Sequence, residues 1–254
     1  MLDYFQNLLS LSSTELITAL LVVFIAGIVR GFSGFALSAL IMAGLTLTIP
    51  PTSLIPICIL LEAVASALMI RSGFKNADRR IAWALAITSA MGMPLGLLAT
   101  MSVSEDVSRF IALALIVLLA LMQLLRKSPA FLGTKPGLYA AGLTAGIAGG
   151  LAGVAGMVVA LFVLAQNAAP AVMRASLVMY LFLGIFSSVF WLTLSGLLDS
   201  LAITRGLFLA PVAIIGVMIG THLFRPSLEV FYKRFCLGLL IFVAVAGLLR
   251  LAIG

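Results

Sequence analysis

Arg30 places a permanent positive charge inside apolar sequence, next to residues that interrupt a helix. Apolar runs flank it on both sides, and Gly31, Ser33 and Gly34, which do not favour a continuous helix, follow closely. A helix that restarts after such a break leaves backbone N–H groups free at its N-terminus, where anions bind. The guanidinium adds a planar, bidentate donor for carboxylate, sulfonate or phosphate groups. These four residues indicate anion binding, with Ser33 as the expected N-cap of the second helix.

Two other ionisable residues lie in apolar sequence. Glu62 lies near the middle of an apolar span, where a carboxylate must be paired with a cation or protonated. An ion pair with Arg30 and a role in proton coupling are both open. Arg174 lies a few residues into another span, where its side chain either extends to the headgroups or contributes to a site. The structural alternative is that Arg30 only balances Glu62 or reaches a headgroup, while the glycines only let helices pack closely.

Enzymatic, metal and disulfide chemistry have little support in the sequence. The chain has one histidine and two cysteines, Cys58 and Cys236, which lie far apart in apolar runs. A nucleophile–base pair or a set of metal ligands would need more such residues close together. We therefore expect no enzymatic activity, no metal and no cofactor.

The composition indicates a membrane protein. Of the 254 residues, 63% are hydrophobic and 9% are charged, whereas soluble domains have about 25% charged residues. Repeated apolar runs of about 14–22 residues approach the length that crosses a lipid bilayer. The sequence therefore predicts an all-α polytopic integral membrane protein. We interpret the net charge of +7 as the charge of cytoplasmic loops rather than as a nucleic-acid surface.

Two segments are too long for one membrane crossing and too short for two. Residues 16–49 and 137–168 have this length, and each contains a glycine-rich break, GFSG at 31–34 and GLAG at 150–153. We interpret each segment as two short helices, either re-entrant or a pair of short crossings. Three further spans follow each pair, at 53–70, 81–101 and 108–125 in the first half and at 172–193, 203–224 and 235–253 in the second.

Loop charges divide the connections into two groups. Basic residues dominate loops 71–80, 126–135 and 225–234, whereas loop 102–109 is net negative and loop 194–205 is neutral. The positive-inside rule predicts that the three basic loops lie in the cytoplasm. The other two loops and both chain termini are then expected on the extracytoplasmic side.

The chain contains a weak internal repeat of about 120 residues. Segment 26–36 aligns with 145–155 at an offset of 119, and segment 91–96 aligns with 215–220 at an offset of 124. The loop charges give the two copies opposite orientations, and inverted-topology repeats are typical of secondary transporters. The predicted copies are 1–128 and 129–254, which together form one membrane domain.

Several short motifs resemble those of a known family. They are GFSGFA at 31–36, Pro50–Pro51, the LLE that ends at Glu62, GLAGVAG at 150–156, and the Arg-Ala-Ser-Leu that begins at Arg174. Over essentially the whole chain, the sequence resembles the sulfite exporter TauE/SafE family, also called the toluene sulfonate uptake permease family. The resemblance implies a bacterial inner-membrane protein that moves sulfite, sulfonates, sulfoacetate or similar anions. Residues 153–158 lack the GxGGP-like pattern of many members, so the particular anion stays open.

The sequence and the resemblance together predict a secondary transporter of a small organosulfur or related organic anion. An anion channel and a membrane assembly factor without transport of its own are the alternatives. Protons are a candidate coupling ion, no nucleic-acid partner is expected, and the direction of transport and the oligomeric state are open. Glu62 is expected to be a coupling residue or an ion-pair partner. The predicted substrate-binding residues are Arg30, Gly31, Ser33, Gly34, Gly150, Gly153 and Arg174.

Overall fold

The computed structural model describes residues 9–125, 130–166, 170–223 and 229–253, and these ranges contain helices and connections but no strand. The chain termini, and parts of loops 126–135 and 225–234, lie outside the described residues. The elements in chain order are α2 (Ser13–Ser33), α3 (Leu37–Leu45), α4 (Pro51–Asn76), α5 (Arg79–Ser102), α6 (Glu105–Leu124), η1 (Ala130–Gly133), α7 (Lys135–Ala152), α8 (Ala155–Ala165), α9 (Pro170–Leu194), α10 (Ser200–Leu223) and α11 (Glu229–Ile253).

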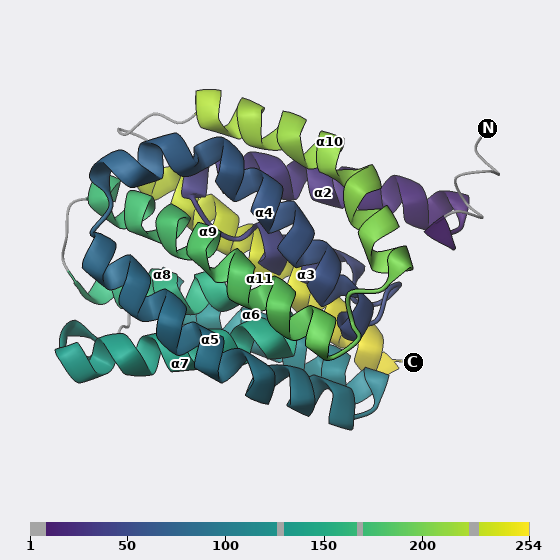
Figure 1. The fold of residues 1–254 in the computed structure, drawn as a ribbon. Coiled ribbons are helices and arrows are strands. Elements are labelled where there is room, and N and C mark those ends of the chain that lie inside the picture. The colour runs from purple at the N-terminus through teal and green to yellow at the C-terminus, as the bar shows by residue number, and fades with distance from the viewer. Residues whose placement is uncertain (1–8, 126–129, 167–169, 224–228, 254) are drawn as a thin grey trace.

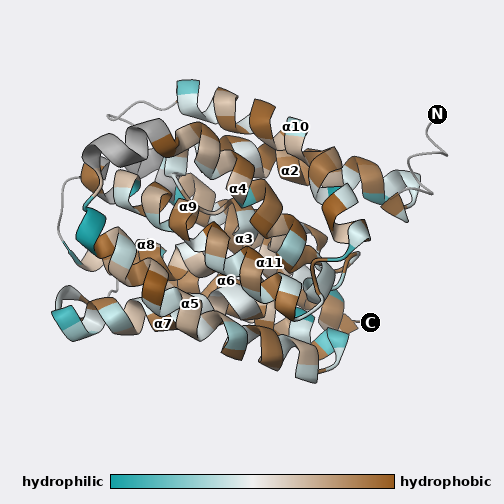
Figure 2. Ribbon diagram, viewed as in Figure 1, coloured by the Kyte–Doolittle hydropathy of each residue, from teal (hydrophilic) through white to brown (hydrophobic). Residues whose placement is uncertain are grey.

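Seven of the described helices are long and apolar enough to cross a membrane: α2, α4, α5, α6, α9, α10 and α11. Each of the six predicted spans coincides with one of these helices to within a few residues. The outer surface is apolar as well, because large side chains such as Met91, Leu207 and Phe242 are exposed. Figure 2 shows that hydrophobic residues occur along the whole length of the helices. The all-helical prediction is therefore confirmed.

The first predicted pair of short helices is unequal. Helix α2 has 21 residues, about 31 Å at 1.5 Å per residue, which is long enough to cross the hydrocarbon core. It continues through Gly31 to Ser33 and is capped by Gly34, which has the left-handed φ of +80°. Helix α3 has nine residues and, at about 14 Å, is too short to cross. The helix break therefore lies at 34–36, later than the start of the GFSG motif suggested.

The second pair has the same construction. Helix α7 has 18 residues and ends at Gly153, whose φ is +67°. Helix α8 begins two residues later, at Ala155, and has 11 residues. Glycine reaches the left-handed region without the steric cost that a Cβ brings, which explains its place at both helix ends. Each half of the chain thus contains a longer helix, a left-handed glycine and a short returning helix.

The two hairpins enter the bundle from opposite ends (Figure 1). Helix α2 starts at the right-hand end of the view, where the α5–α6 and α9–α10 connections also lie. Helix α7 starts at the left-hand end, with the α4–α5 connection. The acidic and neutral loops, 102–109 and 194–205, therefore lie at one end of the bundle. The described parts of basic loops 71–80 and 126–135 lie at the other.

Close contacts between glycines join the two halves. Helix α2 packs on α10, and α5 packs on α7. A Cβ at Gly27 would lie 3.1 Å from Cα of Gly216, and a Cβ at Gly96 would lie 2.9 Å from Cα of Gly150. Gly31 packs against the backbone of α10, where a Cβ would overlap Val217 O. Such small residues let membrane helices approach closely, which explains why α2 remains helical through Gly31.

Candidate functional site

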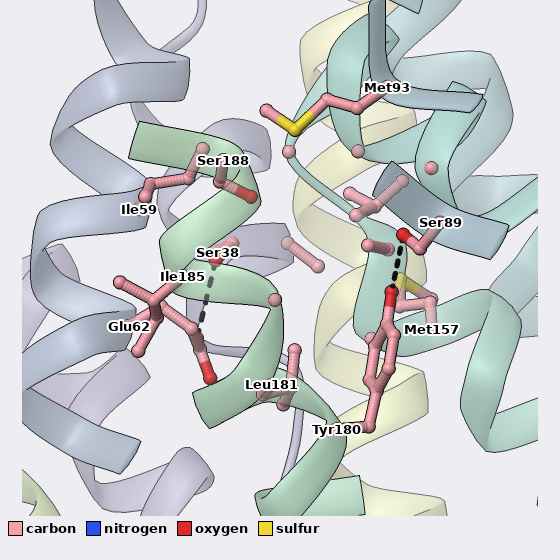
Figure 3. A pocket seen from close by; sticks show the side chains of 18 of the residues that line it. Ser38, Ile59, Glu62, Ser89, Met93, Met157, Tyr180, Leu181, Ile185 and Ser188 are labelled. Carbon is pink, nitrogen blue, oxygen red and sulfur yellow. Dashed lines mark hydrogen bonds between the residues drawn. The ribbon is translucent and has the colours of Figure 1, made fainter. Parts of the chain in front are cut away.

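A cavity of about 60 Å³ lies inside the helix bundle, between the two helix breaks. A single water needs roughly 10–15 Å³ of such space, so the cavity has room for a few waters or a small anion. Its wall is mostly apolar, with a few polar groups, as is usual for small-molecule sites. Figure 3 shows the polar side chains that line it, which are Ser38, Glu62, Ser89, Tyr180 and Ser188.

The N-termini of both short helices border this cavity. Ala36 precedes α3 and Val154 precedes α8, and neither helix start receives a hydrogen bond from a capping side chain. Residues of both first turns, including Ser38 and Ala155, line the cavity. Helix N-termini carry partial positive charge and N–H groups without intrahelical partners. Two such ends at one cavity make an arrangement suited to a negative charge.

Ser33 is not the N-cap of α3, so that prediction is wrong. Its hydroxyl accepts a hydrogen bond from the Phe35 N–H at 3.2 Å and donates one to the Phe35 carbonyl at 2.6 Å. The break extends to Ala36, which occupies the cap position with a φ of 76°. Ser33 therefore stabilises the turn between the helices and leaves the N-terminus of α3 open.

The two breaks lie close to each other. A Cβ added at Gly153 would lie 4.0 Å from Cβ of Ser38. A Cβ added at Gly156 would lie 3.9 Å from Cβ of Phe35. Residues that are more than one hundred positions apart in the chain thus form one site.

Arg30 is completely buried and forms an ion pair with Glu62. Its Nε lies 2.7 Å from Glu62 Oε1, at the distance of an ion pair although not in the direction of a hydrogen bond. The two terminal nitrogens donate to Ser66 Oγ, at 3.0 Å, and to the Gly34 carbonyl. Both ends of the guanidinium are therefore engaged with protein, and the ion pair, one of the two alternatives for Glu62, is present.

Glu62 stands between Arg30 and the cavity. The Glu62 carboxylate lines the cavity wall, and its side chain is 9% exposed. Its other oxygen, Oε2, accepts a hydrogen bond from Ser38 Oγ at 3.3 Å. Ser89 and Tyr180 face it from the other side of the cavity, joined by a 3.0 Å hydrogen bond between their hydroxyls (Figure 3). The wall thus has one ionisable acid on one side and a neutral hydroxyl pair on the other.

The predicted site residues fall into two groups. Gly153 lines the cavity, as does Glu62. Arg174 donates to the Gly31 carbonyl, and its side chain lies against Gly34, so this residue of the second half holds the first break in place. Gly150 packs against the backbone of α5. Arg30, Gly31, Ser33, Gly34, Gly150 and Arg174 are not among the residues that line the cavity, and substrate contact by these residues stays a prediction.

The hydroxyl groups of the cavity were not identified from the sequence. Ser38 could have been identified from the sequence, because it lies in the first turn after the predicted helix break. Ser89 of α5, and Tyr180 and Ser188 of α9, had no such signal, because isolated hydroxyl residues are common in membrane helices. No group of three His, Cys, Asp or Glu side chains able to hold a metal occurs among the described residues.

Comparison with known proteins identifies a family for almost the whole chain. The family model described as "Sulfite exporter TauE/SafE" matches residues 19–247. That range includes both breaks and every residue that lines the cavity. No curated protein matches the chain, and no solved structure matches it.

Proposed function

Because the chain belongs to the sulfite exporter TauE/SafE family, a family of membrane transporters, we propose that it is a secondary transporter of a small organosulfur or related organic anion. Sulfite, a sulfonate or sulfoacetate would suit the site, and the cytoplasmic membrane is the proposed location. The observation that carries this proposal is the pair of uncapped helix N-termini, from α3 and α8, at one internal cavity.

An anion loses most of its hydration when it enters such a cavity, and that loss is costly unless other groups replace the water. First-turn N–H groups of the two short helices replace part of it, at fixed positions. The hydroxyls of Tyr180 and Ser188 line the same space and supply further donors. Arg30 lies behind Glu62, and its positive charge favours anion binding when Glu62 does not neutralise it.

An inverted repeat gives this site a means of opening to either side. The equivalent glycines of the repeat make equivalent contacts: Gly27 and Gly31 on α10 correspond to Gly146 and Gly150 on α5. The hairpins also enter from opposite ends of the bundle (Figure 1). Both features support two inverted copies, 1–128 and 129–254, that rock against each other around the cavity.

Transport by purified protein in liposomes tests this function. A carrier gives uptake that saturates with substrate concentration and responds to a gradient, whereas a channel gives flux proportional to the driving force. Sulfite, methanesulfonate and sulfoacetate are suitable substrates, and empty liposomes are the control. Failure of all three to be transported would favour an assembly factor over a transporter.

A single methyl group tests whether the first turn of α8 contacts the anion. In Gly156→Ala, the new Cβ lies in the cavity wall, with Leu181 at an ordinary 3.4 Å as its nearest neighbour. The protein should therefore fold normally but bind methanesulfonate about tenfold more weakly, the equivalent of about 1.4 kcal/mol. The matched control is Gly238→Ala in α11, where a Cβ meets nothing within 4 Å. Equal affinities for the two variants would exclude this helix end from the site.

A further inference from the structure

We propose that Glu62 is a proton-binding site coupled to anion binding: protonation of its carboxylate frees the charge of Arg30 for the anion, so one proton and one monoanion bind together. This inference rests on the proposed transport function and specifies its co-substrate. It follows from the position of Glu62, which lies between the Arg30 guanidinium and the cavity.

Arg30 cannot bind an anion in the cavity while Glu62 is ionised. The guanidinium has no exposed surface, and the carboxylate that neutralises it lies on the cavity wall. An entering anion would meet the negative carboxylate first, and the positive charge of Arg30 behind it is already neutralised by that carboxylate. Anion binding and an ionised Glu62 therefore oppose each other.

Protonation of Glu62 reverses this situation. The added proton forms an O–H bond on the carboxyl group, and Arg30 keeps its proton because guanidinium groups stay protonated in proteins. One uncompensated positive charge then lies directly behind the wall. An anion in the cavity balances that charge. When the carboxyl group loses its proton, the carboxylate pairs with Arg30 again and the anion is released.

Among the residues whose side chains the structure describes, no other group around Glu62 takes this role. Arg30 faces it from α2 and Cys58 from its own helix, and Tyr180 of α9 is held by Ser89. Cysteine and tyrosine side chains are ordinarily neutral at pH 7, so neither supplies a second acid. Helix α3 contributes only the hydroxyl of Ser38. Arg174 lies against Gly31 and Gly34, and the described cavity-lining residues of α5, α7 and α8 carry no charge.

Linkage makes the coupling reciprocal. If a proton on Glu62 strengthens anion binding, the bound anion strengthens proton binding by the same factor. A monoanion and a proton together add no net charge to the site. The transport cycle is then electroneutral for a monoanion, and a proton gradient drives the anion in the same direction as the proton.

Calorimetric titration with methanesulfonate tests this coupling, because a sulfonate stays ionised across the whole working pH range and any proton uptake belongs to the protein. Titrations in two buffers of different ionisation enthalpy count the protons taken up. We expect one proton per bound anion in the wild-type protein near pH 7. The affinity should fall about tenfold for each unit of rising pH, as linkage of one proton requires.

Two variants sharpen the result. Glu62→Gln imitates the protonated acid, so it should bind methanesulfonate with an affinity independent of pH and without proton uptake. Glu105→Gln removes an exposed carboxylate that pairs with Arg109 and should leave the proton count unchanged. Wild-type binding without proton uptake would overturn the coupling and leave the transporter intact. If methanesulfonate, sulfite and sulfoacetate all fail to bind the wild-type protein, the proposed function fails, and the coupling fails with it.

Discussion

The break after α2 and the break after α7 have similar backbones but different side chains. Both place a glycine in the left-handed region and an uncapped short helix at the cavity. At the repeat offset of 119, Arg30 corresponds to Gly149 and Glu62 to Leu181. The first break thus contains a buried ion pair where the second contains only apolar residues and glycine.

In the proposed mechanism, this difference separates anion binding from proton binding. The feature present in both halves, an uncapped helix N-terminus, binds the anion in this mechanism. The feature present in one half, the Arg30–Glu62 pair, is the one that can change its charge. Two helix N-termini that bind one anion, together with a single Arg30–Glu62 pair that binds one proton, would couple one proton to each anion and not two protons.

The largest expected effect on stability comes from breaking the Arg30–Glu62 ion pair beside the first break. Arg30→Ala leaves the Glu62 carboxylate buried without its cation, which should lower the free energy of unfolding by about 3–5 kcal/mol. Arg30→Gln combined with Glu62→Gln removes both charges and should recover most of that stability. Thermal unfolding of the purified variants in detergent measures this.

The same double variant separates structure from function. Without the guanidinium, methanesulfonate binding should stay lost even when the fold is restored. Full transport by the double variant would show that the pair is structural only.

Substitution of the two left-handed glycines compares the breaks directly. A non-glycine residue at a left-handed φ costs about 1–2 kcal/mol, and this alone should account for Gly153→Ala, where a Cβ meets nothing closer than 3.7 Å. In Gly34→Ala the Cβ would also lie 2.9 Å from Cγ of Arg174, and such overpacking adds about 1–3 kcal/mol. Chemical denaturation of both variants should therefore show a larger loss for Gly34→Ala. Equal losses would mean that Arg174 does not hold the first break.

The smallest expected effect concerns the hydroxyl pair on the cavity wall. Tyr180→Phe removes the hydrogen bond to Ser89 and should lower the free energy of unfolding by about 0.5–1.5 kcal/mol. Methanesulfonate binding should weaken only severalfold, with the proton count unchanged. If calorimetry showed that this variant takes up no proton, the coupled proton would depend on Tyr180 and not on Glu62 alone.

The sequence alone was sufficient for the spans and for the existence of both breaks. Long apolar runs and glycine-rich breaks are local signals, and the structure places helices and helix ends near the predicted positions. A buried acid and a buried base must find partners, which is why the Arg30–Glu62 pair could be anticipated as one alternative.

The exact end of α2 and the hydroxyl groups that line the cavity could not be predicted from the sequence. Gly31 stays helical because it packs on α10, a contact that local sequence does not reveal. Ser33 has the residue type of an N-cap, yet the turn extends to Ala36 and uses Ser33 differently. Ser89 and Tyr180 meet only because α5 packs on α9. The helical state of Gly31 and the meeting of Ser89 with Tyr180 depend on tertiary contacts, whereas the Ser33 turn is local and differs from the expected cap only in its length.

The position of a bound anion tests the central claim most directly. Crystals of the protein grown with selenite, whose selenium scatters anomalously, would locate the anion without a model of its surroundings. We predict one anomalous peak in the cavity, with oxygens roughly 2.7–3.2 Å from first-turn N–H groups of both α3 and α8. A peak bound to surface arginines alone, with no density between Ser38 and Ala155, would contradict the account.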